Sequence, residues 1–106
     1  GFDHWFATQN NAAPSHQDPV NFVRNGQPVG PLKGNSSALT VDEALAFLEK
    51  EKGAPFALFV WFHAPHEPVA VPEAFRREQY PDVPDETKAD YYASVTLMDR
   101  EVGRLL

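Results

Sequence analysis

Two histidines stand close together near the middle of this chain, where an apolar run gives way to prolines. They are His63 and His66, in the stretch FHAPHEP. A histidine can donate from a ring nitrogen to an anionic oxygen, and it exchanges a proton near neutral pH. These residue types therefore allow anion binding and proton transfer. By the sequence physics alone, a structural interpretation is equally open, in which both rings bond backbone groups in a polar loop.

The apolar run before the histidines, PFALFVWF, predicts a strand over residues 56–62. Because it is apolar on both faces, we expect an interior strand covered by helices on each side. Ligands of open α/β sheets gather beyond the carboxyl ends of the strands, and His63 and His66 follow that end. Pro65 restricts Ala64 to extended geometry, so the loop is not expected to close into a helix.

Helical patterns flank the predicted strand. A first helix is expected to begin at Thr40, because Thr40 and Glu43 have the spacing of a capping box, and Gly53 ends the segment. Its apolar stripe consists of Val41, Ala44, Leu45 and Leu48. One helical turn is expected at 73–79, and a second long helix from about Thr87 to the chain end. The buried stripe predicted for that helix consists of Tyr91, Val95, Met98, Val102 and Leu105.

Residues 1–39 are rich in loop-forming residues, whereas residues 40–106 have a helix–strand–loop–helix order. Asn25-Gly26 predicts a short hairpin within 19–29, although Pro28 weakens its second arm. A strand that is apolar on both faces needs neighbours on both edges, and this hairpin does not supply them. We therefore expect an internal fragment of a larger layered α/β domain, unstable or aggregation-prone if made alone.

Charge and composition exclude several functions. Among 106 residues, 15 are acidic and 9 basic, and the net charge of −6 argues against a nucleic-acid partner. We expect no membrane partner, because no run approaches the roughly 20 apolar residues of a membrane span and no polybasic anchor is present. No basic leader or signal peptide is expected at the N-terminus. The absence of cysteine excludes a disulfide framework, a zinc ribbon and a cysteine nucleophile within this chain.

Two further groups in the loop-rich part are candidates for recognition. His4, Trp5 and Phe6 could line a substrate approach, but aromatic residues in such a position more often pack, and packing is the favoured interpretation. The segment 10–21, which contains His16, could shape substrate specificity, because loops on a rigid scaffold tend to carry recognition.

Four stretches together resemble the sulfatase family, in particular arylsulfatase-type enzymes of the alkaline-phosphatase-like superfamily. They are GFDHWFAT, PSHQDPVNFVRNGQPVG, PFALFVWFHAPHEP and YYASVTLMDREVGRLL, in the family's order. The resemblance covers nearly all of the chain and implies that residues 1–106 are an internal part of a sulfatase catalytic domain with a layered sheet.

The resemblance implies that the parent protein hydrolyses sulfate esters of a small molecule or a glycan. In the family, a formylglycine made from the Cys or Ser of a C/S-x-P-x-R motif attacks sulfur, and aspartates and an asparagine hold Ca²⁺. No such motif or metal ligand set is expected within this chain, so the fragment alone is expected to be inactive. Ser15 follows a proline as in the motif, but alanine and histidine replace the nucleophile and the arginine.

The resemblance also assigns roles to the two histidines. His66-Glu67-Pro68 fits the family's His-x-Pro pattern, which makes His66 the catalytic and substrate-binding residue, a donor to the sulfate group. His63, one step behind it, is carried over as a residue that supports or walls the substrate site, and no chemical step is assigned to Glu67. Export to a periplasmic, extracellular or lysosomal compartment is an expectation from the family. The oligomeric state is not indicated.

Two alternatives stay open. One is a phosphoesterase or phosphonate monoester hydrolase of the same superfamily, which a threonine nucleophile outside this chain would favour. The other is a non-catalytic binding module in which His63 and His66 form a metal pair. Two loop histidines can contribute to such a site, but a closed zinc site needs four ligands.

Overall fold

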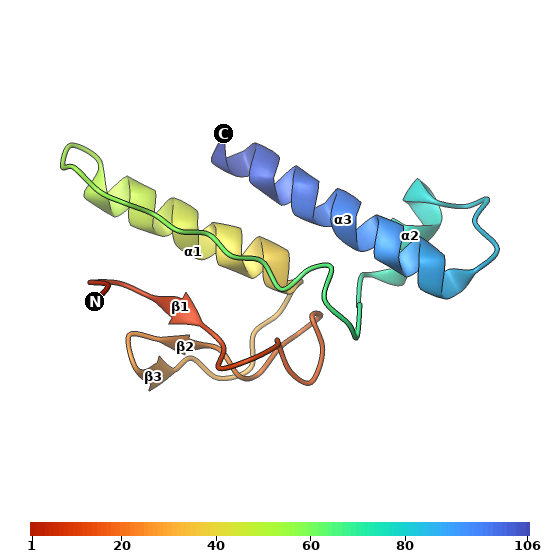
Figure 1. Cartoon of the computed structure of the whole chain (residues 1–106), viewed down its shortest axis with the longest axis horizontal. Helices are drawn as coiled ribbons and strands as arrows, with labels where there is room; N and C mark the ends of the chain where they lie inside the picture. The colour runs from red at the N-terminus through yellow and green to blue at the C-terminus, as the bar shows by residue number, and fades with distance from the viewer.

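The computed structural model describes residues 1–106 as a small α/β arrangement of three short strands and three helices (Figure 1). The elements are, in chain order, β1 (Phe6–Ala7), β2 (Val23–Arg24), β3 (Gln27–Pro28), α1 (Ser36–Glu51), α2 (Glu73–Gln79) and α3 (Glu86–Leu105). The strands form one antiparallel sheet in the order β1-β2-β3. The coarse prediction of an α/β fold is confirmed. No helix is both long enough and apolar enough to cross a membrane.

The predicted hairpin is present, and its turn has the expected geometry. Asn25 and Gly26 have φ angles of +49° and +87°, the left-handed angles that a two-residue hairpin turn requires. The hairpin gains a third strand that the sequence did not predict, because β1 pairs with β2 in the register Phe6 opposite Arg24. A two-residue strand is too short to show an alternating pattern, so β1 had no detectable signal.

The first helix begins earlier than predicted. α1 starts at Ser36 rather than Thr40, and Asn35 is its N-cap, with Oδ1 accepting from the Ser37 backbone N–H at 3.0 Å. The same side chain donates to the Ala70 carbonyl at 3.1 Å, so tertiary structure reinforces the earlier start. Thr40 therefore lies inside the helix, the predicted capping box is wrong, and the boundary between the loop-rich and regular parts moves to residues 35 and 36.

The other two helices follow the predictions closely at their ends. α2 spans 73–79 as expected, and α3 begins one residue before Thr87, capped by Asp85 through the Lys88 backbone N–H at 3.1 Å. The buried face of α3 differs from the predicted stripe, because Tyr91 is 46% exposed. The buried residues of α3 are Ala89, Ala93, Ser94 and Glu101. α3 packs against both α1 and α2, and these contacts decide which of its side chains are buried.

The predicted buried strand at 56–62 is wrong for this chain. The segment pairs with no other strand, and it runs along α1 as an extended stretch (Figure 1). Leu58 and Val60 are half-buried, but Phe59 and Trp61 are 62% and 78% exposed. The physical reason is that a strand needs ladder partners, and within residues 1–106 none pairs with this segment, so one of its faces stays uncovered.

Candidate active site

Three histidines from two loops lie close together at one end of the apolar segment. His16 and His63 have ring centroids 6.0 Å apart, and Phe22 meets the His63 ring edge-on at 5.4 Å. His66 lies one turn further along, because its backbone N–H donates to the His63 carbonyl at 2.8 Å. The sequence predicts that His63 and His66 lie together, and it indicates His16 only as part of a recognition loop. The structure joins all three in one group, here called the histidine cluster.

The contacts of His63 define which of its nitrogens carries a proton. Thr8 Oγ1 donates its hydrogen to the Asn10 carbonyl at 2.6 Å, and it lies 2.8 Å from His63 Nε2. Thr8 must therefore accept from His63 Nε2–H, which leaves Nδ1 as a lone pair. That Nδ1 atom is buried without a hydrogen-bond partner. With neither ring nitrogen free toward solvent, His63 forms part of the wall of the cluster.

His16 is almost fully buried, with 1% of its surface exposed. Its Nε2 lies 2.7 Å from Asn11 Oδ1, the same oxygen that accepts from the Ala12 backbone N–H at 3.0 Å. A backbone N–H can only donate, so this contact fixes the orientation of the Asn11 amide. Nε2 of His16 is consequently the protonated nitrogen.

His66 is the exposed member of the cluster. Its Nδ1 is hydrogen-bonded to the Glu67 carbonyl, which can only accept, so Nδ1 carries a proton. Nε2 is then the nitrogen available for a ligand. On a neutral ring it is a proton acceptor, and on a charged ring it is a donor suited to an anionic oxygen. Of the three histidines, the geometry leaves His66 best placed for chemistry.

Burial keeps the two inner histidines neutral. Desolvation lowers the pKa of His16 below its ordinary value of 6.5, and the neighbouring His66 lowers it further. Desolvation is also the main cause that lowers the pKa of His63, followed by the charges of His16 and His66. Protonating His63 would place a hydrogen on Nδ1, which is buried and has no acceptor.

These lowered pKa values predict that acid destabilises the protein before its carboxylates titrate. In the unfolded chain a histidine takes up its proton near pH 6.5, whereas in the folded chain His16 and His63 resist it. The unfolded state then binds more protons, so the free energy of unfolding falls as the pH drops below 6.5, by at most about 1.4 kcal/mol per pH unit for each histidine. Urea unfolding of the full-length protein at a series of pH values measures this slope.

The double variant His16→Gln/His63→Gln is the matched control for this titration. It lacks both groups and should show a shallower decline between about pH 6.5 and 5, above the range in which ordinary carboxyl groups titrate. An unchanged slope in the double variant would contradict the assignment of the two rings as buried and neutral.

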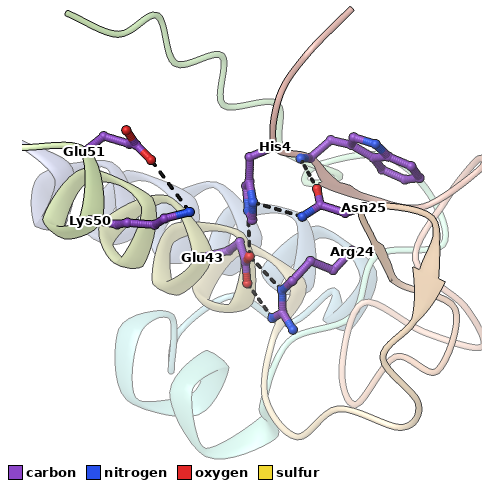
Figure 2. Close-up of polar contacts among 7 residues, drawn as sticks. His4, Arg24, Asn25, Glu43, Lys50 and Glu51 are labelled. Carbon is purple, nitrogen blue, oxygen red and sulfur yellow. Dashed lines mark hydrogen bonds and ion pairs between the residues drawn. The ribbon is translucent and has the colours of Figure 1, made fainter. Parts of the chain in front are cut away.

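His4, the fourth histidine, lies in a separate polar network that ties the N-terminus and the hairpin to α1 (Figure 2). Its Nε2 lies 2.9 Å from Glu43 Oε1, and Arg24 donates two hydrogen bonds to the same carboxylate at 2.8 and 2.6 Å. Arg24 is the main cause that lowers the pKa of Glu43. Since the His4 ring also stacks on Phe47 with centroids 5.8 Å apart, the structure supports the packing interpretation of His4.

The other aromatic candidates near the N-terminus behave differently from each other. Phe6 stacks on Phe22 with ring centroids 4.5 Å apart, so it packs as the favoured interpretation predicts. Trp5 is 42% exposed, and its backbone N–H donates to Asn25 Oδ1 at 2.8 Å. None of the polar contacts of this N-terminal network reaches the histidine cluster.

No group of three or more histidine or acidic side chains is arranged to hold a metal ion. Ser15, which follows a proline as in the nucleophile motif, has its Oγ accepting from the Gln17 backbone N–H at 3.0 Å, a local turn contact. No catalytic step through a metal or through Ser15 is therefore assigned to this chain.

A comparison with known protein families decides the classification. The family model described as Sulfatase matches residues 1–106. The chain belongs to the sulfatase family. A curated relative, the uncharacterized sulfatase YdeN of Escherichia coli (strain K12), is 31% identical over 108 residues. The match covers 100% of this sulfatase chain but 19% of the relative, so the chain spans about a fifth of that relative's length.

Two polar residues that contact the histidine cluster of this sulfatase chain could not be identified from a sequence pattern. Thr8 and Asn11 reach His63 and His66 from positions 55 residues away in the chain. The loop at 10–21 was singled out as a whole, but no spacing pattern distinguishes Asn11 from its neighbour Asn10. Only the folded arrangement brings Asn11 to the histidines.

Proposed function

We propose that the whole protein hydrolyses sulfate esters and that His66 donates a hydrogen bond to the sulfate group. Membership of the sulfatase family supports the reaction class. The observation that supports the role of His66 is its exposure, together with the commitment of Nδ1 to the Glu67 carbonyl. This leaves Nε2 as the ring nitrogen that can face an anion.

In this proposal His66 and His63 have different roles. Nε2–H of a charged His66 stabilises the negative charge that develops on the sulfate oxygens, because a donor that is already oriented needs little reorganisation. His63 walls the site and stays neutral, since its Nε2–H is bonded to Thr8. The His63 ring keeps the turn at 63–66 in place through its packing on Phe22.

The nucleophile and the metal belong to other segments of the protein in this proposal. We propose a formylglycine nucleophile and a calcium ion, as in the family, within an alkaline-phosphatase-like layered domain. When bound, the metal would supply charge stabilisation to the nucleophile and the ester. The substrate class is a sulfated small molecule or glycan, and the resemblance to exported sulfatases makes a periplasmic, extracellular or lysosomal location part of the proposal.

The test compares two esters that differ only in the transferred group. The full-length enzyme should hydrolyse nitrophenyl sulfate with a higher kcat/KM than nitrophenyl phosphate, measured by release of nitrophenol. Removing divalent cations with a chelator should abolish turnover, and Ca²⁺ should restore it. A preference for the phosphate ester would instead support the phosphoesterase alternative, and no turnover of either ester or of a sulfated glycan would support a non-catalytic module.

A further inference from the structure

The side chain of Asn11 connects the loop that carries His16 to the loop that carries His66. Its Oδ1 is bonded to His16 and to the Ala12 backbone, so its Nδ2 points the other way. Nδ2 donates to the Glu67 carbonyl at 3.2 Å and lies 3.5 Å from His66 Nδ1. Both N–H groups are directed at one carbonyl oxygen, because two donors cannot bond each other.

These two hydrogen bonds determine the orientation of the Glu67 carbonyl relative to the ring of His66. A carbonyl oxygen has two lone pairs, and here one accepts from Asn11 while the other accepts from His66 Nδ1–H. The bond from Asn11 holds the peptide in the orientation that the His66 ring requires. The Asn11 side-chain amide is in turn held by the buried His16 and by the Ala12 backbone N–H, while Asn21 Nδ2 donates to the Asn11 main-chain carbonyl at 2.9 Å.

We propose that Asn11 is a positioning residue for His66: it holds the Glu67 carbonyl that accepts from His66 Nδ1–H, and so orients the ring with Nε2 toward the sulfate group. This inference rests on the proposed function of His66 and adds the residue that orients it. The titratable groups close to His66 are His16 and His63, and Glu67 follows it in the chain. An uncharged amide fits between the imidazoles without adding a charge to the cluster.

The substitution Asn11→Asp distinguishes a role of Asn11 in orienting His66 from a role in holding its own loop together. Aspartate keeps the size of the side chain and an oxygen for His16 and Ala12, but it replaces the Nδ2 donor by an acceptor that repels the Glu67 carbonyl. In the full-length enzyme we expect kcat for a sulfate ester to fall by about 10-fold or more with a smaller change in KM, because misplacing a catalytic group affects the transition state most. Wild-type kcat in Asn11→Asp would overturn the proposal.

A double-mutant cycle shows whether the effect passes through His66. If Asn11 acts by orienting that ring, Asn11→Asp should lower kcat much less in a His66→Ala background than in the wild-type enzyme. Fully multiplicative losses would overturn the proposal, because they would show that Asn11 acts on catalysis by another route. Thermal unfolding of each variant checks that the compared enzymes are equally folded.

A spectroscopic measurement tests the positioning even if no sulfate ester is turned over. In ¹⁵N-histidine-labelled full-length protein at alkaline pH, where a histidine ring is neutral, the ring nitrogens of His66 should show a fixed Nδ1–H tautomer. In Asn11→Ala, loss of the bond to the Glu67 carbonyl should shift them toward a mixture of tautomers. Identical His66 signals in wild type and Asn11→Ala would overturn the inference, whereas absent turnover with the predicted tautomer change would reject only the proposed reaction.

The substitution His16→Gln provides a conservative control for the buried end of this connection. Glutamine can place an N–H near the position of His16 Nε2, and asparagine is too short to do so. We expect His16→Gln to retain more of the wild-type kcat, and more of the fixed His66 tautomer, than His16→Asn. The reverse order would contradict a connection that runs from His16 through Asn11.

Discussion

Replacing His66 by alanine in the full-length enzyme is expected to lower kcat for sulfate-ester hydrolysis by about 10²-fold or more. His66 is the exposed ring of the histidine cluster, and its Nε2 is the nitrogen that other contacts leave open. Removing a donor that faces developing charge costs more in the transition state than in the ground state. Steady-state kinetics with nitrophenyl sulfate should therefore show a large fall in kcat and a modest change in KM.

The matched control is another histidine of the same chain that lies outside the cluster. His4 bonds Glu43 and stacks on Phe47, and no contact connects it to His66. We expect His4→Gln to retain kcat close to the wild-type value, provided that the protein is folded. Unaltered turnover in His66→Ala would contradict the proposed role of His66, whatever the behaviour of the control.

The largest effect on stability is expected from Phe22→Ala. Phe22 is 1% exposed, stacks on Phe6 with centroids 4.5 Å apart and meets the His63 ring edge-on at 5.4 Å. Truncating such a ring removes buried apolar surface and leaves a cavity, which costs about 3–5 kcal/mol. Urea unfolding of the full-length protein measures the loss, and turnover should also fall because the His63 wall loses its support.

The variant Phe22→Leu tests whether the effects of Phe22→Ala come from lost side-chain volume or from disruption of the fold. Leucine fills most of the space but lacks the ring, so we expect a cost below about 1.5 kcal/mol and turnover closer to wild type. Equal unfolding free energies for wild type and Phe22→Ala would show that Phe22 does not support the histidine cluster as the structure indicates.

Local features of the sequence predicted several elements because their determinants lie within a few residues. Asn25-Gly26 adopts positive φ angles wherever a tight hairpin forms, and the short helix at 73–79 follows a proline that ends the preceding loop. The predicted start of the last helix, about Thr87, lies one residue after its observed start at Glu86, where Asp85 caps the helix. At α1 the predicted cap, Thr40, is wrong. Asn35 caps the helix partly because it also bonds the Ala70 carbonyl.

Burial could not be predicted in the same way, because it depends on partners distant in the chain. The apolar run 56–62 predicts an interior strand on its own, yet within residues 1–106 no segment pairs with it, and Trp61 stays 78% exposed. On α3 the predicted stripe begins at Tyr91, which is 46% exposed, and the buried residues are instead Ala89, Ala93, Ser94 and Glu101, because the contacts with α1 and α2 decide which side chains are covered.

For the candidate site, the sequence by itself determined the chemistry and the tertiary structure decided the roles. The pattern at His63 and His66 placed two imidazoles after an apolar segment, and the resemblance to sulfatases selected His66. Only the fold shows which ring is buried and which ring nitrogen is free. It also shows that Asn11 joins the loops. The reason is physical: hydrogen bonds and desolvation act between neighbours in space, and Thr8 and Asn11 lie about half the chain away from His63 and His66.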